Sequence, residues 1–250
     1  MNLQQEKKIP LLEGKGITKR FGGIVALENV NFKLYQDEVL ALLGDNGAGK
    51  STLIKIISGA YLPDRGELFL EGKKVNINNP QTAKNLGIET VYQDLALFNV
   101  LDVPTNLFMG REITKSVGVL DKRKMYVETK NILRNLKIKL KSIKEKVGNL
   151  SGGQQHAVAI GRAVYLSRPK IILMDEPTAG LGAQESEKVL ELIKQLKKQK
   201  ISIILISHNL EHVFKVADRA IVLLSGKVVG ERAISQTSRD ELVKMMLGAI

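Results

Sequence analysis

Residues 44–52 read Gly44-Asp45-Asn46-Gly47-Ala48-Gly49-Lys50-Ser51-Thr52 and decide which fold this chain can adopt. They fit the phosphate-loop pattern G-x-x-x-x-G-K-[ST], with an apolar run before them and a helical pattern from Lys50 to about Ser58 after them. The glycines let backbone N–H groups turn toward phosphate oxygens, and the helix start adds the positive end of its dipole. Lys50 would neutralise charge between the β- and γ-phosphates, and the Ser51 hydroxyl would bind Mg²⁺. The whole stretch from Gly44 to Thr52 is therefore predicted to bind a nucleotide.

Two carboxylates follow a second apolar run. Ile171–Asp175 reads as a buried strand, and Glu176 comes directly after it. Ligands of open α/β sheets bind where the carboxyl ends of the strands meet solvent. We therefore predict that Asp175 holds Mg²⁺, through water, and that Glu176 polarises the attacking water. A strand that simply ends in two solvated acids is the alternative, and the phosphate loop disfavours it.

Two further residues end apolar runs. His208 follows Ile201–Ser207 and would reach the γ-phosphate at the same sheet edge. Gln93 follows Ile88–Val91 and would contact Mg²⁺ or the attacking water. Taken singly, a histidine after a strand is more often structural, and a lone glutamine is a weak signal.

A second glycine-rich helix start lies one hundred residues after Ser51. The segment Leu150–Gln155 contains four candidate anion-binding residues, Ser151, Gly152, Gly153 and Gln154. A serine and two glycines at a helix start expose N–H groups to an anion. Two such starts in one chain suggest either two phosphates or one site shared between subunits.

The order of patterns predicts an α/β fold with a mainly parallel sheet covered by helices on both faces. Short strands fill the first third, at Leu12–Thr18, Val30–Leu34, Glu38–Leu43 and Glu67–Leu70. The range from Pro80 to about Val147 is lysine-rich and helical, which indicates an inserted lobe. We expect one domain over residues 9–247, with a core at about 9–80 and 160–235, a helical lobe at about 80–160, and a short helical tail at 236–250.

Composition excludes several classes of protein and binding site. The 250 residues hold 38 Lys and Arg against 26 Asp and Glu, a formal charge of +12, and no cysteine. Disulfide scaffolds and thiolate zinc sites are excluded. No apolar run approaches the roughly 20 residues that span a bilayer, and no secretory h-region opens the chain. Basic residues run along helices, such as Lys188 and Lys194, and aromatics are few, so direct nucleic-acid binding is not expected.

In this order, these elements resemble the ATP-binding cassette (ABC) ATPases, and the LSGGQQ segment is the discriminating one. The similarity runs from about Leu11 to Gly230, and it implies the phosphate-loop ABC-ATPase fold, with a mainly parallel core sheet, an antiparallel β subdomain and an inserted helical lobe. It implies that Gln93 is the Q-loop, Ser151–Gln154 the signature, Asp175 and Glu176 the Walker B pair, and His208 the switch histidine. It also places Phe21 under the adenine ring, with plain core packing as the alternative for that side chain.

The resemblance implies a head-to-tail homodimer that closes on ATP and Mg²⁺ and opens on hydrolysis. The Gln93 loop and the helical lobe would face permease subunits at the cytoplasmic face of the membrane. Three segments look like those of importers of simple sugars, which act with a sugar-binding protein: 91–97, 106–112 and 207–214. Gly182 stands where the family usually has an aspartate. An ABC ATPase for a branched-chain amino acid or lipid, or a soluble one acting on nucleic acid, are the alternatives.

Overall fold

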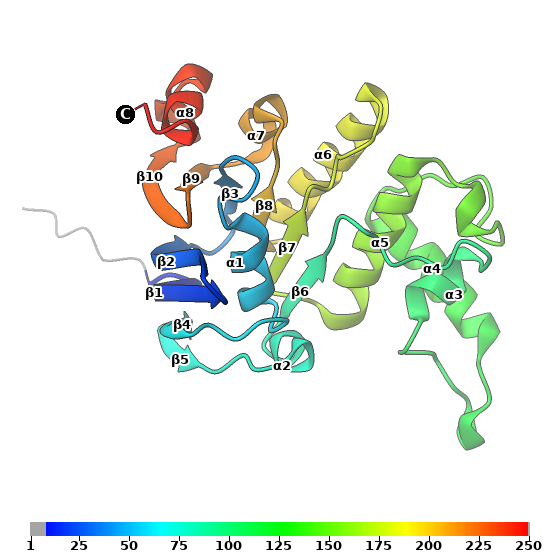
Figure 1. Cartoon of the computed structure of the whole chain (residues 1–250). Coiled ribbons are helices and arrows are strands. Elements are labelled where there is room, and N and C mark those ends of the chain that lie inside the picture. Colours follow the sequence, from blue (N-terminus) through cyan, green and yellow to red (C-terminus); the bar gives the residue numbers. More distant parts are fainter. Residues whose placement is uncertain (1–8, 250) are drawn as a thin grey trace, which may run out of the picture.

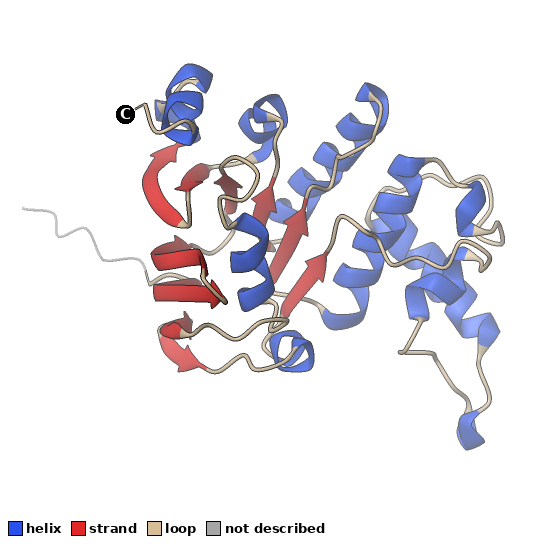
Figure 2. Cartoon of the chain, in the orientation of Figure 1, coloured by secondary structure: helices blue, strands red, loops and turns tan. Residues whose placement is uncertain are grey.

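The central element of the computed structural model, which describes residues 9–249, is a six-stranded sheet with the order β10-β9-β3-β8-β7-β6. Its strands are β3 (Val39–Leu43), β6 (Ile88–Val91), β7 (Ile171–Asp175), β8 (Ser202–Ile206), β9 (Arg219–Leu224) and β10 (Lys227–Ala233). Strands β9, β3, β8, β7 and β6 run parallel, and β10 turns back on β9 as a hairpin. The predicted α/β class with a mainly parallel sheet is confirmed (Figure 2).

Strand β7 shows why this sheet is covered on both faces. Successive side chains of a strand point to opposite faces. Ile171 and Leu173 pack with α1 (Lys50–Ile57), whereas Ile172 and Met174 pack with α6 (Ala183–Lys198). All four side chains are fully buried, so the strand reads as a continuous apolar run.

The second sheet is antiparallel, with the order β2-β1-β4-β5. Its strands are β1 (Leu12–Phe21), β2 (Ile24–Leu34), β4 (Arg65–Leu70) and β5 (Lys73–Val75). Strands β1 and β2 extend further than the sequence patterns predicted, and they meet at the turn Gly22-Gly23. The turn brings Ile24 and its neighbours close to the phosphate loop, with consequences for the site below.

A helical lobe lies at the far side of the core sheet from this antiparallel sheet (Figure 1). It contains α3 (Val103–Phe108), α4 (Lys122–Asn135) and α5 (Gly152–Ser167). The range from residue 80 to about 147 is not helical throughout, contrary to the prediction. It includes β6, which pairs with β7 in the main sheet because its apolar side chains complete the buried edge of that sheet. The short helix α2 (Pro80–Asn85) packs against β6.

Two further helices complete the structure. Helix α7 (Leu210–Val216) and helix α8 (Arg239–Met246) pack over β3 and β9. Helix α8 falls within the range expected to be a helical tail.

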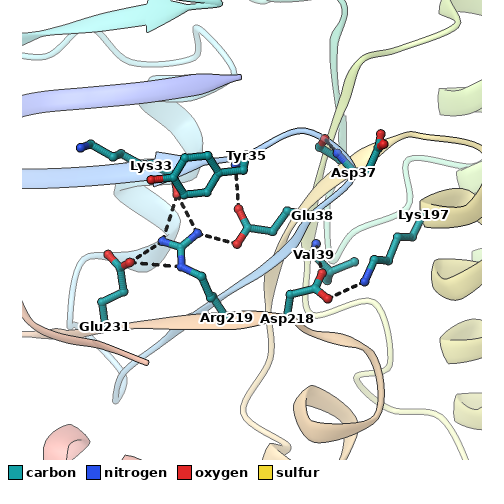
Figure 3. A network of polar contacts seen from close by, with 10 residues as sticks. Lys33, Tyr35, Asp37, Glu38, Val39, Lys197, Asp218, Arg219 and Glu231 are labelled. Atoms are coloured by element: carbon teal, nitrogen blue, oxygen red, sulfur yellow. Dashed lines mark hydrogen bonds and ion pairs between the residues drawn. The ribbon is translucent and has the colours of Figure 1, made fainter. Parts of the chain in front are cut away.

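A partly buried ion-pair network ties the two sheets together (Figure 3). Arg219 at the start of β9 binds Glu38, Glu231 and the carbonyl of Lys33. Burial raises the pKa of Glu38, and the guanidinium of Arg219 opposes that shift. Asp218 accepts the Val39 N–H at 2.8 Å and pairs with Lys197. The connection from β2 to β3 is therefore fixed to the core at the end of β3 opposite the phosphate loop.

Candidate nucleotide site

The phosphate loop joins β3 to α1, and its glycines adopt conformations that other residues rarely reach. Gly49 is the N-cap of α1 with φ 102°, and no side chain caps the helix. A Cβ on Gly49 would lie 2.6 Å from the Ala26 carbonyl oxygen. The first N–H groups of α1 are therefore left without a side-chain acceptor, which is the arrangement that binds phosphate.

Lys50 lies inside this loop. Its Nζ donates to the carbonyl oxygens of Gly44 at 2.8 Å and Asp45 at 2.9 Å. Only 6% of the residue is exposed. Burial lowers the pKa of Lys50, and the nearby carboxylates of Glu176, Asp45 and Asp175 oppose that shift.

A pocket of about 310 Å³ opens next to the loop and gathers most of the predicted site residues. Those that line it are Asn46, Gly47, Ala48, Gly49, Lys50, Ser51, Thr52, Gln93, Asp175, Glu176 and His208. They come from the phosphate loop, from the ends of β6, β7 and β8, and from the residues after them. Gly44 and Asp45 do not line the pocket, but their carbonyl oxygens accept hydrogen bonds from Lys50 Nζ.

Glu176 is the most unusual residue of this pocket. Its backbone is left-handed, with φ 53°, and its N–H donates to the Ile206 carbonyl at 3.1 Å. His208 Nε2 lies 3.0 Å from Glu176 Oε1, but without hydrogen-bond geometry, so that this buried oxygen has no hydrogen-bond partner. Burial raises the pKa of Glu176, as it does that of Asp175. A buried carboxylate oxygen with a free lone pair is well suited to accept a proton from a bound water.

The signature segment lies apart from the residues that line this pocket. Ser151 is the N-cap of α5 and forms a complete capping box with Gln154. The Ser151 N–H donates to Gln154 Oε1 at 3.1 Å, and the Gln154 N–H donates to Ser151 Oγ at 3.4 Å. Leu181 and Glu185 pack against Gly152 and Gly153. The four signature residues line no wall of the nucleotide pocket in this chain.

Phe21 also lies outside the pocket walls. The residue is 43% exposed, and its ring packs edge-on against Tyr61, with ring centres 5.3 Å apart. Its neighbours Ile24, Val25 and Ala26 do line the pocket, as does Ile206. Ile24, Val25 and Ala26 were not expected at the site, because the apolar pattern places the start of the second strand at Val30, whereas β2 begins at Ile24. The turn signal Gly22-Gly23, followed by apolar residues, could have revealed them.

Comparisons with known proteins agree with this geometry. Residues 27–179 match the family model described as ABC transporter. The chain is 50% identical to the xylose/arabinose import ATP-binding protein of Sulfolobus acidocaldarius, over 94% of this chain and 93% of that protein. It is 43% identical to the fructose import ATP-binding protein of Rhizobium meliloti, over 96% and 95% respectively. Against the ribose import ATP-binding protein of Caldanaerobacter subterraneus it is 44% identical, over 96% of this chain but 48% of that protein.

Among solved structures, ATP-binding cassettes superpose on this chain. A crystal structure of an ATP-binding cassette in its ADP conformation superposes with a TM-score of 0.81 at 28% identity, covering 96% of this chain and 99% of that one. A dimeric cassette in a post-hydrolysis state, bound to ADP and Pi, superposes with a TM-score of 0.74 at 28% identity, covering 89% and 98%.

The fold and the pocket thus define an ATP-binding cassette, an ATPase built on a phosphate loop. This chain belongs to the ABC transporter family, as its motifs predicted. Within residues 9–249, no helix has the length and apolar character needed to cross a bilayer.

Proposed function

We propose that this chain is the ATP-hydrolysing subunit of a membrane importer for a monosaccharide. It would act as a head-to-tail homodimer at the cytoplasmic face of the membrane, bound to permease subunits that receive sugar from a binding protein. The cargo is inferred from relatives that import xylose or arabinose, fructose and ribose. The ATPase assignment rests on the observation that the phosphate loop, Glu176 and His208 line one and the same pocket.

The residues of the pocket divide the work of binding. The free N–H groups of the loop and the Lys50 ammonium would hold the β- and γ-phosphates. Asn46, Ser51 and Thr52 line the pocket beside them. Phe21, exposed at the end of β1, would stack on the adenine ring.

The polar residues present fit a magnesium ion. Among residues 9–249, no group of three or more acidic, histidine or cysteine side chains is arranged to hold a metal ion by itself, so phosphate oxygens and water would have to complete the coordination. Mg²⁺ suits such a site because it keeps several waters and takes phosphate oxygens as ligands. The Ser51 hydroxyl, Asp175 and Gln93, which all line the pocket, would hold it. When bound, the ion would neutralise charge on the phosphates.

Glu176 would act as the general base. Its Oε1, which accepts no hydrogen bond within the chain, would accept a proton as a water oxygen attacks the γ-phosphorus and the bond to the leaving ADP oxygen breaks. His208, 3.0 Å from the same oxygen, would position that carboxylate and contact the γ-phosphate.

The signature supports a dimer in which each site has two halves. Ser151–Gln154 do not line the pocket of their own chain, so a nucleotide bound there would not be expected to contact them. A second copy, placed head to tail, would supply Ser151 and the start of α5 to the γ-phosphate. Gly182, the exposed N-cap of α6, would lie in the loop between the two halves.

The test is the molar mass of Glu176→Gln by light scattering, with and without ATP and Mg²⁺. We expect a monomer that becomes a dimer when ATP is added, and turnover reduced about 10²- to 10⁴-fold from wild type. Wild-type turnover in this variant would exclude Glu176 as the base. A monomer in every condition, even at saturating ATP, would contradict a dimer of the isolated chain.

A further inference from the structure

The positive charge of this protein is concentrated in one segment of the helical lobe, and is not spread evenly along the chain. Residues 122–146 contain ten basic and two acidic side chains, a net charge of +8 out of the total +12. We call the ten basic side chains the basic lobe surface. They are Lys122, Arg123, Lys124, Lys130, Arg134, Lys137, Lys139, Lys141, Lys144 and Lys146.

All ten side chains are exposed, and none has an ion-pair partner within the described part of the chain. Basic residues elsewhere are often paired, as Lys215 is with Glu187 and Arg232 with Glu241. Unpaired like charges repel one another, so the approach of a polyanion lowers their electrostatic free energy.

Helix α4 presents part of this array as a stripe. Its buried face carries Met125, Thr129, Ile132 and Leu133, which pack into the lobe. The opposite face repeats at spacings of four, three and four residues, the spacing of one side of a helix. That outer stripe is Arg123, Val127, Lys130 and Arg134, and all four are exposed.

Exposed aliphatic side chains accompany the charges. Val127 on the stripe is 52% exposed. Val119 and Leu120, just before α4, are 62% and 45% exposed. They end a loop that extends away from the rest of the lobe between α3 and α4 (Figure 1). Lysine and arginine beside exposed aliphatic residues are typical of segments that lie at a lipid–water interface.

We propose that the basic lobe surface binds the headgroups of an anionic membrane, in addition to the contacts with a permease. The choice of a membrane over other polyanions rests on the proposed function at the membrane face. It also rests on composition, because Tyr126 is the one aromatic residue between 109 and 150 and its hydroxyl is bonded to Asp102. A surface for nucleic acid would gain from aromatic side chains that stack on bases, and aliphatic ones add little to phosphate contacts.

The experiment is co-sedimentation of the full chain with vesicles, without nucleotide or permease. One set contains phosphatidylcholine alone, and the other contains about one-third phosphatidylglycerol, each at about 0.1 M and about 1 M salt. We expect binding to the anionic vesicles at low salt only. The triple variant Arg123→Gln, Lys130→Gln, Arg134→Gln should bind at least about tenfold more weakly, since each basic residue near the surface contributes about fivefold.

A matched control removes the same charge elsewhere. Lys73, Lys188 and Lys198 are exposed and have no ion pair among the described residues, so their triple change to Gln should alter binding less than about threefold. Equal loss in both triples, or no binding of wild type to anionic vesicles, would overturn the proposal. So would preferential binding of a short DNA duplex over anionic vesicles at equal salt. Thermal melting of both triples checks that they fold.

This outcome is separable from that of the ATPase proposal. Vesicle binding needs no nucleotide, whereas dimer formation by Glu176→Gln needs no lipid. A protein that dimerises with ATP but ignores anionic vesicles keeps the proposed function and loses the membrane surface.

Discussion

Helices α1 and α5 both begin after a glycine-rich segment, yet their N-termini are in opposite states. At α1 the N-cap is Gly49, which has no side chain to accept a hydrogen bond from the helix. At α5 the N-cap is Ser151, whose hydroxyl and whose partner Gln154 complete a capping box. The first helix is open to an anion in the single chain, whereas the second has satisfied part of its own donors. A phosphate that binds at α5 must share the Ser151 hydroxyl with the Gln154 N–H. The uncapped start of α1 is therefore suited to bind the nucleotide in the single chain, whereas the capped start of α5 is suited to bind it only when a second copy brings the nucleotide to it.

The largest effect that would test this comparison is the loss of Lys50. Lys50→Ala removes a buried cation that would pair with two phosphates, each charged hydrogen bond being worth about 1.5–3 kcal/mol. We expect ATP affinity to fall about 100-fold or more, measured by equilibrium titration. Affinity like that of wild type would contradict the phosphate-loop assignment.

A somewhat smaller effect is expected from filling the glycine cradle at α1. Gly49→Ala would force a Cβ to 2.6 Å from a backbone oxygen at φ 102°. We expect a loss of about 2–3 kcal/mol in the free energy of unfolding, measured by urea titration, together with weaker ATP binding.

Gly47→Ala is the matched control for that change. Gly47 has φ 79°, but no atom lies within 4 Å of its added Cβ. Backbone strain alone should lower the free energy of unfolding of this variant by about 1 kcal/mol. Equal effects of the two variants would show that close approach at Gly49 is not what the loop requires.

Much of this contrast could be predicted from the sequence, because it is local. Both glycine-rich helix starts and the run before Asp175 are set by residues within a few positions of one another. Contacts between distant segments could not be predicted this way. Arg219 and Glu38 pair across 181 positions. Likewise, β6 pairs with β7 because its apolar side chains complete a buried edge of the main sheet. Ile24–Ala26 line the pocket because the turn at Gly22 brings them there.

The capped helix start should show a more modest response. Ser151→Ala removes one N-cap bond and should lower the free energy of unfolding by about 1 kcal/mol, measured by urea titration. ATP affinity of the monomer should stay unchanged, because Ser151 does not line the pocket of its own chain. ATP-driven dimerisation should weaken when the change is added to Glu176→Gln. Reduced affinity in the monomer would show that the signature acts within one chain.

The smallest effect concerns a third helix start, that of α3. Its N-cap Asp102 accepts the Thr105 N–H at 2.9 Å and the hydroxyl of Tyr126. Burial raises the pKa of Asp102, but the bonds from Thr105 and Tyr126 outweigh it and lower the pKa below the ordinary 3.8. The stabilisation is therefore complete above pH 3.8 and is lost as the pH falls through the lowered folded-state value.

Asp102→Asn should keep the cap and lose its charge. We expect a change of a few tenths of a kcal/mol at neutral pH. Below pH 3.8, the melting temperature of the variant should fall less steeply than that of wild type. Parallel melting curves over that range would show that this cap does not titrate on unfolding.

The left-handed backbone of Glu176 carries a consequence for the resting protein. A residue with a side chain pays roughly 1 kcal/mol to hold φ 53°, and here its carboxylate is also buried, with one oxygen that accepts no hydrogen bond. Both penalties fall on the state without nucleotide. Glycine at this position would relieve both, so an inactive Glu176→Gly protein should outlast the active one on heating. The residue on which turnover depends thus costs the cassette stability, and thermostability gained at this position would be gained at the expense of activity.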